Sequence, residues 1–158
     1  MKKIVLAAVV VALSSGSAFA ASATGAASAN VIAPISITHT VGATLNFGTF
    51  DAATGGSVTV TQAGVGSAGG SVNFVSGSTN SADAFTVTGD GNRGFTIATT
   101  GGSVTSGGNS MAFTTSAPAT GTLASGAGGF SVGGTLTVAS GQAVGSYTGS
   151  YTATVNYQ

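Results

Sequence analysis

The chain has 158 residues, no cysteine, three basic and three acidic side chains, and one histidine. Two of the basic residues lie among the first three positions, so the remainder carries only Arg93 against three aspartates. This charge excludes binding to nucleic acid or to an anionic lipid surface, because both ligands require clustered Lys and Arg. The lack of cysteine excludes disulfides, so any fold must be held by its apolar core.

The first twenty residues have the pattern of a secretory signal. Two lysines precede the apolar run Ile4–Leu13, and Ala18-Phe19-Ala20 offers small residues at a cleavage site. The run is too short to span a bilayer, so we expect no integral membrane segment after processing. We expect export through the periplasm to the cell surface. The expected organisation is a signal peptide (1–20), a short arm (21–30) and one domain (31–158).

Short alternations of apolar and polar residues follow in chain order. Side chains of a strand alternate between two faces, so these runs predict β-strands. The glycine-rich stretches Gly64–Gly70 and Gly126–Gly134 are interpreted as turns. The predicted strands cover 31–38, 45–50, 57–61, 71–75, 84–88 and 94–98, followed by runs around Met111 and Phe113, Phe130 and Val132, and Leu136 and Val138.

Two local signals refine this order. Pro34 cannot donate a ladder hydrogen bond, so the first strand is predicted at a sheet edge. Asp90-Gly91 lies between two alternating runs and predicts a hairpin turn. Many short strands punctuated by glycine predict an all-β chain folded as an immunoglobulin-like antiparallel β-sandwich with Greek-key connections.

The most regular alternation is Tyr147–Gln158, which we predict to be one continuous, half-buried strand. Its apolar face must be covered by another part of this chain or by a partner. That face consists of Tyr147, Gly149, Tyr151, Ala153, Val155 and Tyr157.

Reactive chemistry is sparse in this sequence. His39 is the only histidine and is predicted at the surface near a strand end, and no G-x-S-x-G motif accompanies it. No second histidine, cysteine or glutamate is present to complete a metal site. Asp90-Gly91-Asn92 lacks the later ligands of a calcium loop and is interpreted as a turn. We expect no enzymatic activity, no metal and no cofactor.

Five segments resemble the secreted bacterial domain-of-unknown-function family 4402, over roughly residues 30–158. The terminal pattern G-x-Y-x-G-x-Y-x-x-x-V-x-Y and LNFGTF are the most specific of them. The resemblance implies export and a β-sandwich, but no settled activity. The segments are VIAPISIT (31–38), LNFGTF (45–50), GFTIA (94–98), VGGTLTV (132–138) and GSYTGSYTATVNYQ (145–158).

The C-terminal residues also resemble those of chaperone–usher pilus subunits, with Tyr157 in the penultimate position and Gly145 fourteenth from the end. The resemblance implies that this strand pairs with a periplasmic chaperone and later with a donor strand of the next subunit, and it implies an usher as a further partner. Two donors are conceivable: the arm, which has only alanine and glycine at alternate positions, or the first strand, which Pro34 interrupts. The candidate pairing residues are Gly145, Tyr147, Tyr151, Ala153, Val155 and Tyr157, with Val31, Ile35 and Ile37 in the first strand.

Three functions remain open at this point. The first is a non-enzymatic cell-surface structural protein, a pilus, fibre or coat subunit that assembles with itself or related subunits by β-strand addition. The second is a monomeric, self-complete adhesion or binding module whose own first strand covers the last. The third is a small outer-membrane β-barrel, which is less favoured because most predicted strands are near five residues rather than about ten.

Overall fold

The structure is a computed structural model that describes residues 19–52 and 54–158. Most of the predicted signal peptide therefore lies outside the described residues. The chain divides into two units, Met1–Val31 and Ile32–Gln158. In the first unit, residues 19–31 are exposed and contain no helix or strand. Across the described ranges, no helix is both long and apolar enough to cross a membrane.

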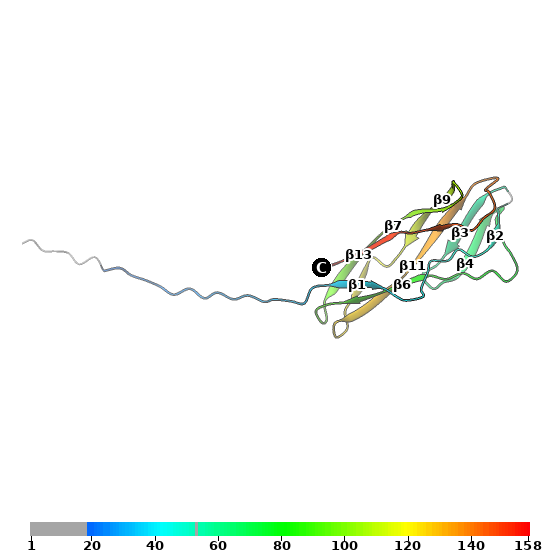
Figure 1. Cartoon of the computed structure of the whole chain (residues 1–158). Coiled ribbons are helices and arrows are strands. Elements are labelled where there is room, and N and C mark those ends of the chain that lie inside the picture. Colours follow the sequence, from blue (N-terminus) through cyan, green and yellow to red (C-terminus); the bar gives the residue numbers. More distant parts are fainter. Residues whose placement is uncertain (1–18, 53) are drawn as a thin grey trace, which may run out of the picture. The chain divides into compact units, whose positions relative to one another are not determined.

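The second unit consists of strands and confirms the all-β prediction (Figure 1). The strands are β1 (Ser36–His39), β2 (Phe50–Asp51), β3 (Gly56–Val60), β4 (Gly66–Gly70), β5 (Asn73–Phe74), β6 (Asp83–Thr88), β7 (Gly94–Thr100), β8 (Gly102–Ser106), β9 (Asn109–Ser116), β10 (Thr120–Thr122), β11 (Ala127–Val138), β12 (Thr148–Gly149) and β13 (Thr152–Tyr157).

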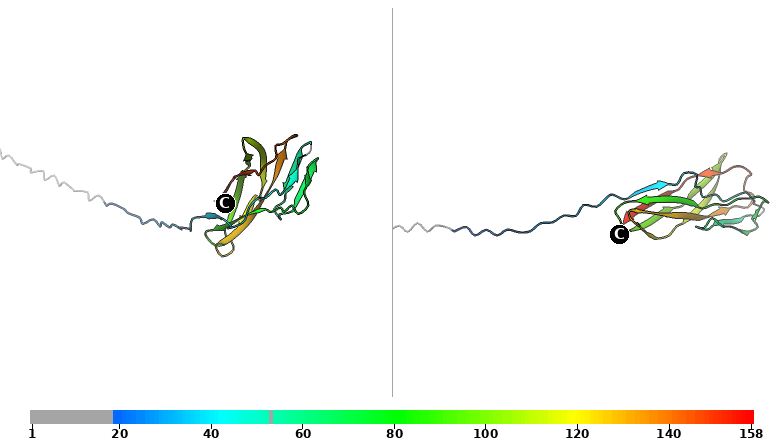
Figure 2. Two further views of the ribbon diagram at one scale, coloured as in Figure 1. Left: turned by 45° about the vertical axis from the view of Figure 1, so that its right-hand side comes forward. Right: turned by 90° about the horizontal axis from the view of Figure 1, so that it is seen from below.

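These strands form antiparallel sheets that pack as a β-sandwich. The largest sheet has the order β1-β6-β11-β9-β8-β12, and β3 pairs with β11 and with β4. A second sheet has the order β10-β7-β13, and β2 pairs with β5. The turned views in Figure 2 show these strands from two further sides. The β7–β13 pair faces the β1–β6–β11 part of the large sheet across a shared apolar cluster.

β11 is the longest strand, and it corrects two sequence-based predictions. Its first half pairs with β6 and its second half with β3 and β9, with the change at Gly133–Gly134. The sequence predicted two strands here and a turn over 126–134. Only Gly126, with φ of 86°, takes the positive φ of a turn. The later glycines instead let neighbouring backbones approach closely, because they have no Cβ.

We predict that Gly133→Ala destabilises the domain by about 1–3 kcal/mol, since a methyl group there would overlap the carbonyl oxygen of Val60. The matched control is Gly91→Ala, where the nearest atom to the new methyl lies at an ordinary 3.6 Å. Urea denaturation of both variants measures the difference. Equal midpoints for the two variants would contradict the close approach of β3 to β11.

The core is divided into two apolar clusters. We call them the β3/β9 cluster and the β7/β13 cluster, after strands that contribute to each. Tyr151 packs against both clusters and so connects them. The buried members are Phe47, Val58, Val60, Val72, Met111, Phe113, Leu136 and Val138 in the β3/β9 cluster, and Val87, Phe95, Ile97, Leu123, Phe130, Val132 and Val155 in the β7/β13 cluster.

The first predicted strand is shorter than expected. β1 begins at Ser36, so Val31 lies outside any strand, with 93% of its surface exposed. Pro34 explains the late start, because proline lacks the N–H and restricts the residue before it. Ile35 and Ile37 pack against the β7/β13 cluster, as their predicted inward position requires.

Several other predicted strand boundaries were wrong. β4, β8 and β10 are built largely from glycine, serine and threonine, so no apolar alternation marked them. β4 lies within Gly64–Gly70, which the sequence reading interpreted as a turn. Conversely, the runs 45–50 and 71–75 are mostly irregular: the two-residue strands β2 and β5 pair there, and Asn46 forms a single antiparallel bridge with Ser81.

The predicted continuous strand 147–158 is interrupted at Ser150–Tyr151. β12 pairs with β8 in the large sheet, whereas β13 pairs with β7 in the other sheet. The terminal segment therefore changes sheets. Inward-facing Tyr151, Ala153, Val155 and Tyr157 are half-buried or buried, and the alternate residues are exposed, so the predicted faces hold for β13.

The glycines before the interruption do not belong to that inward face. Gly149 is exposed, and a Cβ there would overlap the carbonyl oxygen of Ser103. Gly145 is also exposed and lies outside any strand, where a Cβ would come within 2.6 Å of the Ser106 hydroxyl. Both glycines permit close approach to β8 rather than filling the interior.

Candidate functional site

Asp83 is the only buried charged side chain among the described residues, with 5% of its surface exposed. It begins β6 and lies on the same face as Phe85 and Val87, so strand alternation directs it toward the interior. A buried carboxylate is unfavourable unless hydrogen bonds compensate for its lost hydration. The groups that surround Asp83 are therefore the main polar feature of the domain interior.

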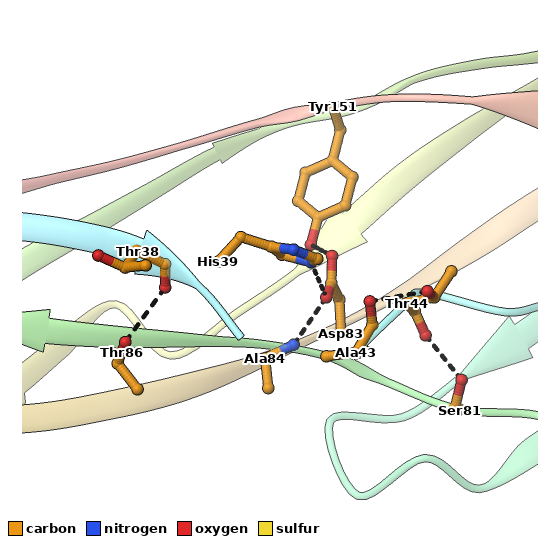
Figure 3. A network of polar contacts seen from close by, with 9 residues as sticks. All are labelled: Thr38, His39, Ala43, Thr44, Ser81, Asp83, Ala84, Thr86 and Tyr151. Carbon is orange, nitrogen blue, oxygen red and sulfur yellow. Dashed lines mark hydrogen bonds and ion pairs between the residues drawn. The ribbon is translucent and has the colours of Figure 1, made fainter. Parts of the chain in front are cut away.

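Three donors surround the Asp83 carboxylate (Figure 3). The Nε2 atom of His39, at the end of β1, lies 2.6 Å from Oδ1. The hydroxyl group of Tyr151 donates to Oδ2 at 2.8 Å, and the backbone N–H of Ala84 donates to Oδ1 at 2.8 Å. We call His39, Asp83 and Tyr151 the polar cluster. It joins β1, β6 and the point where the terminal segment changes sheets.

Aromatic rings extend from the polar cluster into both halves of the core. The Phe85 ring lies edge-on to His39 at 5.2 Å and stacks on Phe130 at 5.3 Å. The ring of Tyr151 makes edge-to-face contacts with Phe85 and Phe113, each at 6.2 Å. Such pairs add about 0.5–1.5 kcal/mol beyond area burial, so Tyr151 is fixed by packing as well as by its hydroxyl group.

The environment of Tyr151 favours its neutral form. Burial raises the pKa of the hydroxyl group, and the hydrogen bond to Asp83 and the charge of that carboxylate raise it further. The hydroxyl group of Tyr151 therefore stays a donor to Asp83 well beyond the pH at which an exposed tyrosine ionises, about 10.

We predict that Tyr151→Phe costs about 1–3 kcal/mol, because the buried Asp83 carboxylate loses one donor. In the wild-type protein the raised pKa of Tyr151 means that the folded state holds its proton more tightly than the unfolded state. This contribution is therefore complete below about pH 10 and declines as the pH rises above it. Denaturant titrations at pH 7 and above pH 10 measure both effects.

The matched control for this prediction is Tyr147→Phe. The Tyr147 hydroxyl group bonds to the Ala143 carbonyl and to Gln142 near the surface, so its removal should change stability by less than about 0.5 kcal/mol. Equal losses in the two variants would contradict the role assigned to Asp83.

A cavity of about 380 Å³ opens beside the polar cluster. Its walls are the segment that follows β1 and the segment around Ser150, between β12 and β13. Its polar lining includes His39, Asp83 and Tyr151. Its apolar lining includes Leu45, Phe47, Phe85, Val104 and Phe113. The cavity thus gives solvent access to core side chains next to the terminal segment.

A second feature is the outer edge of β13. The Gln158 N–H donates to the Gly94 carbonyl at 3.2 Å. This bond identifies which residues of β13 form hydrogen-bonded pairs with β7. Antiparallel pairs alternate between hydrogen-bonded and non-hydrogen-bonded. The backbone N–H and C=O groups on the edge away from β7 therefore belong to Ala153, Val155 and Tyr157. Among the described residues, no strand pairs with that edge.

The far end of the same strand is tied to the segment before β1. The hydroxyl group of Tyr157 donates to the Ala33 carbonyl at 2.8 Å and accepts the Asp90 N–H at 2.6 Å. β1 and β13 thus lie near each other as edge strands of two facing sheets. Tyr157 holds one end of the boundary between them, and the polar cluster holds the other.

The structure brings together only some of the residues that the sequence predicted to take part in strand pairing. Tyr151, Ala153, Val155, Tyr157, Ile35 and Ile37 gather at the β1–β13 boundary. Tyr147 packs against the β3/β9 cluster instead, and Val31 and Gly145 take no part.

The sequence reading missed the contact between His39 and Asp83. Alternation could have found it, because His39 continues the inward face of Ile35 and Ile37, and Asp83 that of Phe85. Within the described part of the chain, no group of three or more His, Cys, Asp or Glu side chains could hold a metal ion.

Comparison with known proteins gives one positive result. No curated protein and no solved structure matches the chain. Residues 35–157, which are more than half of the chain, match the family described as domain of unknown function DUF4402. The chain therefore belongs to the DUF4402 family.

Proposed function

We propose that this protein is a non-enzymatic structural subunit, exported through the periplasm to the cell surface, that assembles into a fibre or coat by β-strand addition. A strand of a neighbouring subunit pairs with the outer edge of β13. The neighbour is a second copy of this chain or a related subunit. A periplasmic chaperone and an usher are the expected partners during export.

The observation that carries this proposal is the open edge of β13. Its outward N–H and C=O groups, at Ala153, Val155 and Tyr157, have the spacing that an added strand requires. Natural edge strands are normally protected by charged side chains, by proline or by a covering segment. β13 contains no charged residue and no proline. An edge of this kind is suited to pairing with another chain.

The order of the strands also supports the proposal. In an immunoglobulin sandwich, strands A, B and E are neighbours in one sheet, and strands C, F and G in the other. Here β1, β6 and β11 are neighbours, as are β7 and β13. In this comparison β13 corresponds to strand F, and its outer edge is where strand G would pair. An added strand would complete the second sheet.

The cavity offers a site for a side chain of the added strand. A strand that pairs along β13 and continues past Tyr151 would bring one of its side chains to the cavity. The lining is mainly aromatic and aliphatic, so an apolar side chain would be favoured. Burial of one large aliphatic side chain contributes about 1.5–3 kcal/mol, in addition to the backbone hydrogen bonds.

Examination of surface material tests this proposal. Electron microscopy should show fibres or a coat on cells that express the gene. Cells from which the gene is deleted should lack them. The extracted protein should form SDS-resistant multimers that collapse to the monomer on boiling. A surface protein that is monomeric before boiling, from cells without fibres, would refute assembly.

The cavity also favours a second candidate, a monomeric binding module. Its volume and mixed lining fall within the range of small-molecule sites, which are mostly apolar with a few polar groups. The bonds of Tyr151 and Tyr157 close part of the β1–β13 boundary within one chain, as a self-complete domain requires. The SDS-resistant multimers distinguish the candidates, because only the fibre subunit forms them.

A further inference from the structure

We propose that the cavity beside the polar cluster binds a small organic cation whose ammonium group is fully methylated, of the type of choline. The proposal goes beyond assembly, because the site lies within one chain and requires no neighbouring subunit. It is carried by the aromatic rings that line the cavity and by the buried negative charge of Asp83.

The rings that line the cavity are steeply inclined to one another. The centroids of Phe47 and Phe113 lie 5.9 Å apart, with 59° between the ring planes. The Tyr151 ring stands at 88° to Phe113 and at 80° to Phe85. Rings with these inclinations cannot form one flat surface, so they bound the cavity from more than one side. All four belong to its lining.

Aromatic walls of this kind favour a cation. The face of an aromatic ring carries partial negative charge and attracts a cation within about 6 Å of the ring centroid. The attraction is strongest where water is excluded, and Phe47 and Phe113 are only 8% and 6% exposed. Quaternary ammonium ions are typical ligands of sites walled by aromatic rings.

Asp83 adds a full negative charge to the same lining. Its carboxylate accepts hydrogen bonds from the Tyr151 hydroxyl group and from the Ala84 N–H, and both donors are uncharged (Figure 3). Tyr151 stays neutral because burial, and then the bond and charge of Asp83, raise its pKa. These bonds hold the carboxylate in place without neutralising it.

No fixed cation of the described residues compensates for this charge. Arg93 is the only Arg or Lys among them, and its side chain pairs with Asp90. His39 contacts Asp83 but carries a charge only when it is protonated. With His39 neutral, the cavity has a net negative charge that a bound cation would compensate.

The lining also favours a methylated ammonium group over a primary one. Oδ1 of Asp83 is already in contact with His39 and Ala84, and Oδ2 with Tyr151. A primary ammonium ion brings three N–H donors, and a donor left without an acceptor in a closed site weakens binding. A quaternary ammonium ion has no N–H group, so it requires only the ring faces and the charge.

NMR titration of the unassembled, exported chain tests the site. The ligands are choline, its uncharged analogue 3,3-dimethylbutan-1-ol, and methylammonium, at constant ionic strength. The measurement is made at pH 8, at the upper end of the range in which histidine ordinarily changes charge. Choline should bind at least about tenfold more tightly than either of the other ligands, and it should shift the ring signals of Phe85 and Tyr151.

Two variants separate the charge from the rings. Asp83→Asn should weaken choline binding by about tenfold or more and affect the uncharged analogue much less. Phe85→Leu keeps an apolar side chain but removes a ring, so it should also weaken binding of choline more than of the analogue. The matched controls are Asp51→Asn at an exposed carboxylate and Phe50→Leu at a half-buried ring, because neither residue lines the cavity. Both controls should bind choline as the wild type does.

Equal affinity of the wild type for choline and for its uncharged analogue would overturn the proposal, as would the absence of saturable binding of choline. If Asp83→Asn does not fold, this comparison of ligands in the wild type still decides. Strand addition is tested separately, because the SDS-resistant multimers do not depend on choline. Their absence would leave the cation site intact, and failure of choline to bind would leave strand addition intact.

Discussion

Val155→Asp is expected to prevent the protein from accumulating in a folded form. Val155 is 8% exposed in the β7/β13 cluster, and it lies opposite Ile97 in the β13–β7 register. No basic side chain belongs to that cluster, so the new carboxylate would be buried without a partner. An uncompensated buried charge costs on the order of 3–5 kcal/mol, a large part of the roughly 5–15 kcal/mol that stabilises a typical domain.

Thr154→Asp is the matched control, because it adds the same charge one residue earlier on the exposed face of β13. Its effect on stability should be within about 0.5 kcal/mol. The measurement is the amount of soluble, protease-resistant protein after export, with circular dichroism of the purified variants. Tyr151→Asp should resemble Val155→Asp, since it places a second carboxylate beside Asp83. Normal yields of Val155→Asp would refute the inward direction of that residue.

Ala153→Pro is expected to abolish assembly while the domain still folds. The N–H of Ala153 lies on the outer edge of β13, so proline removes no bond of the β13–β7 ladder. Proline is tolerated in edge strands when the missing N–H would face away from the sheet, and it blocks pairing on that side. We expect the unfolding midpoint to change little and the SDS-resistant multimers to disappear.

Thr154→Pro separates this effect from simple destabilisation. The N–H of Thr154 belongs to the β13–β7 ladder, so its loss should destabilise the monomer by an amount typical of a broken sheet hydrogen bond, about 1–3 kcal/mol. Thr154→Pro should therefore lower the stability of the monomer, whereas Ala153→Pro should lower assembly without that loss of stability. Multimers of Ala153→Pro at wild-type levels would contradict addition at this edge.

Apolar alternation predicted the fold class and the inward residues of β13, because burial imposes a period of two on a half-buried strand. It failed where burial is achieved without large side chains. β4, with the sequence GSAGG, has no apolar residue larger than alanine, and the glycines of β11 serve close backbone approach rather than turns. The change from one sheet to the other at Ser150–Tyr151 could not be predicted either, because the alternation of apolar and polar residues continues through it.

The candidate site was only partly accessible from sequence. Tyr151 was identified as buried, but its partner was not, because the predicted strand began at Ala84 and left Asp83 outside it. His39 was predicted near a strand end at the surface, and it does close β1 with about half of its side chain exposed. Its contact with Asp83 joins residues 44 positions apart. Such a pair follows from sheet register, which depends on the whole fold rather than on local pattern.

The central claim is that a partner strand pairs with the outer edge of β13, and amide hydrogen exchange before and after assembly tests it most directly. The N–H groups of Ala153, Val155 and Tyr157 should exchange rapidly in the unassembled protein and become strongly protected, by about a hundredfold or more, in the assembled form. Those of Thr154 and Asn156, already bonded to β7, should be protected in both forms. Rapid exchange at Ala153, Val155 and Tyr157 in the assembled form would contradict the account.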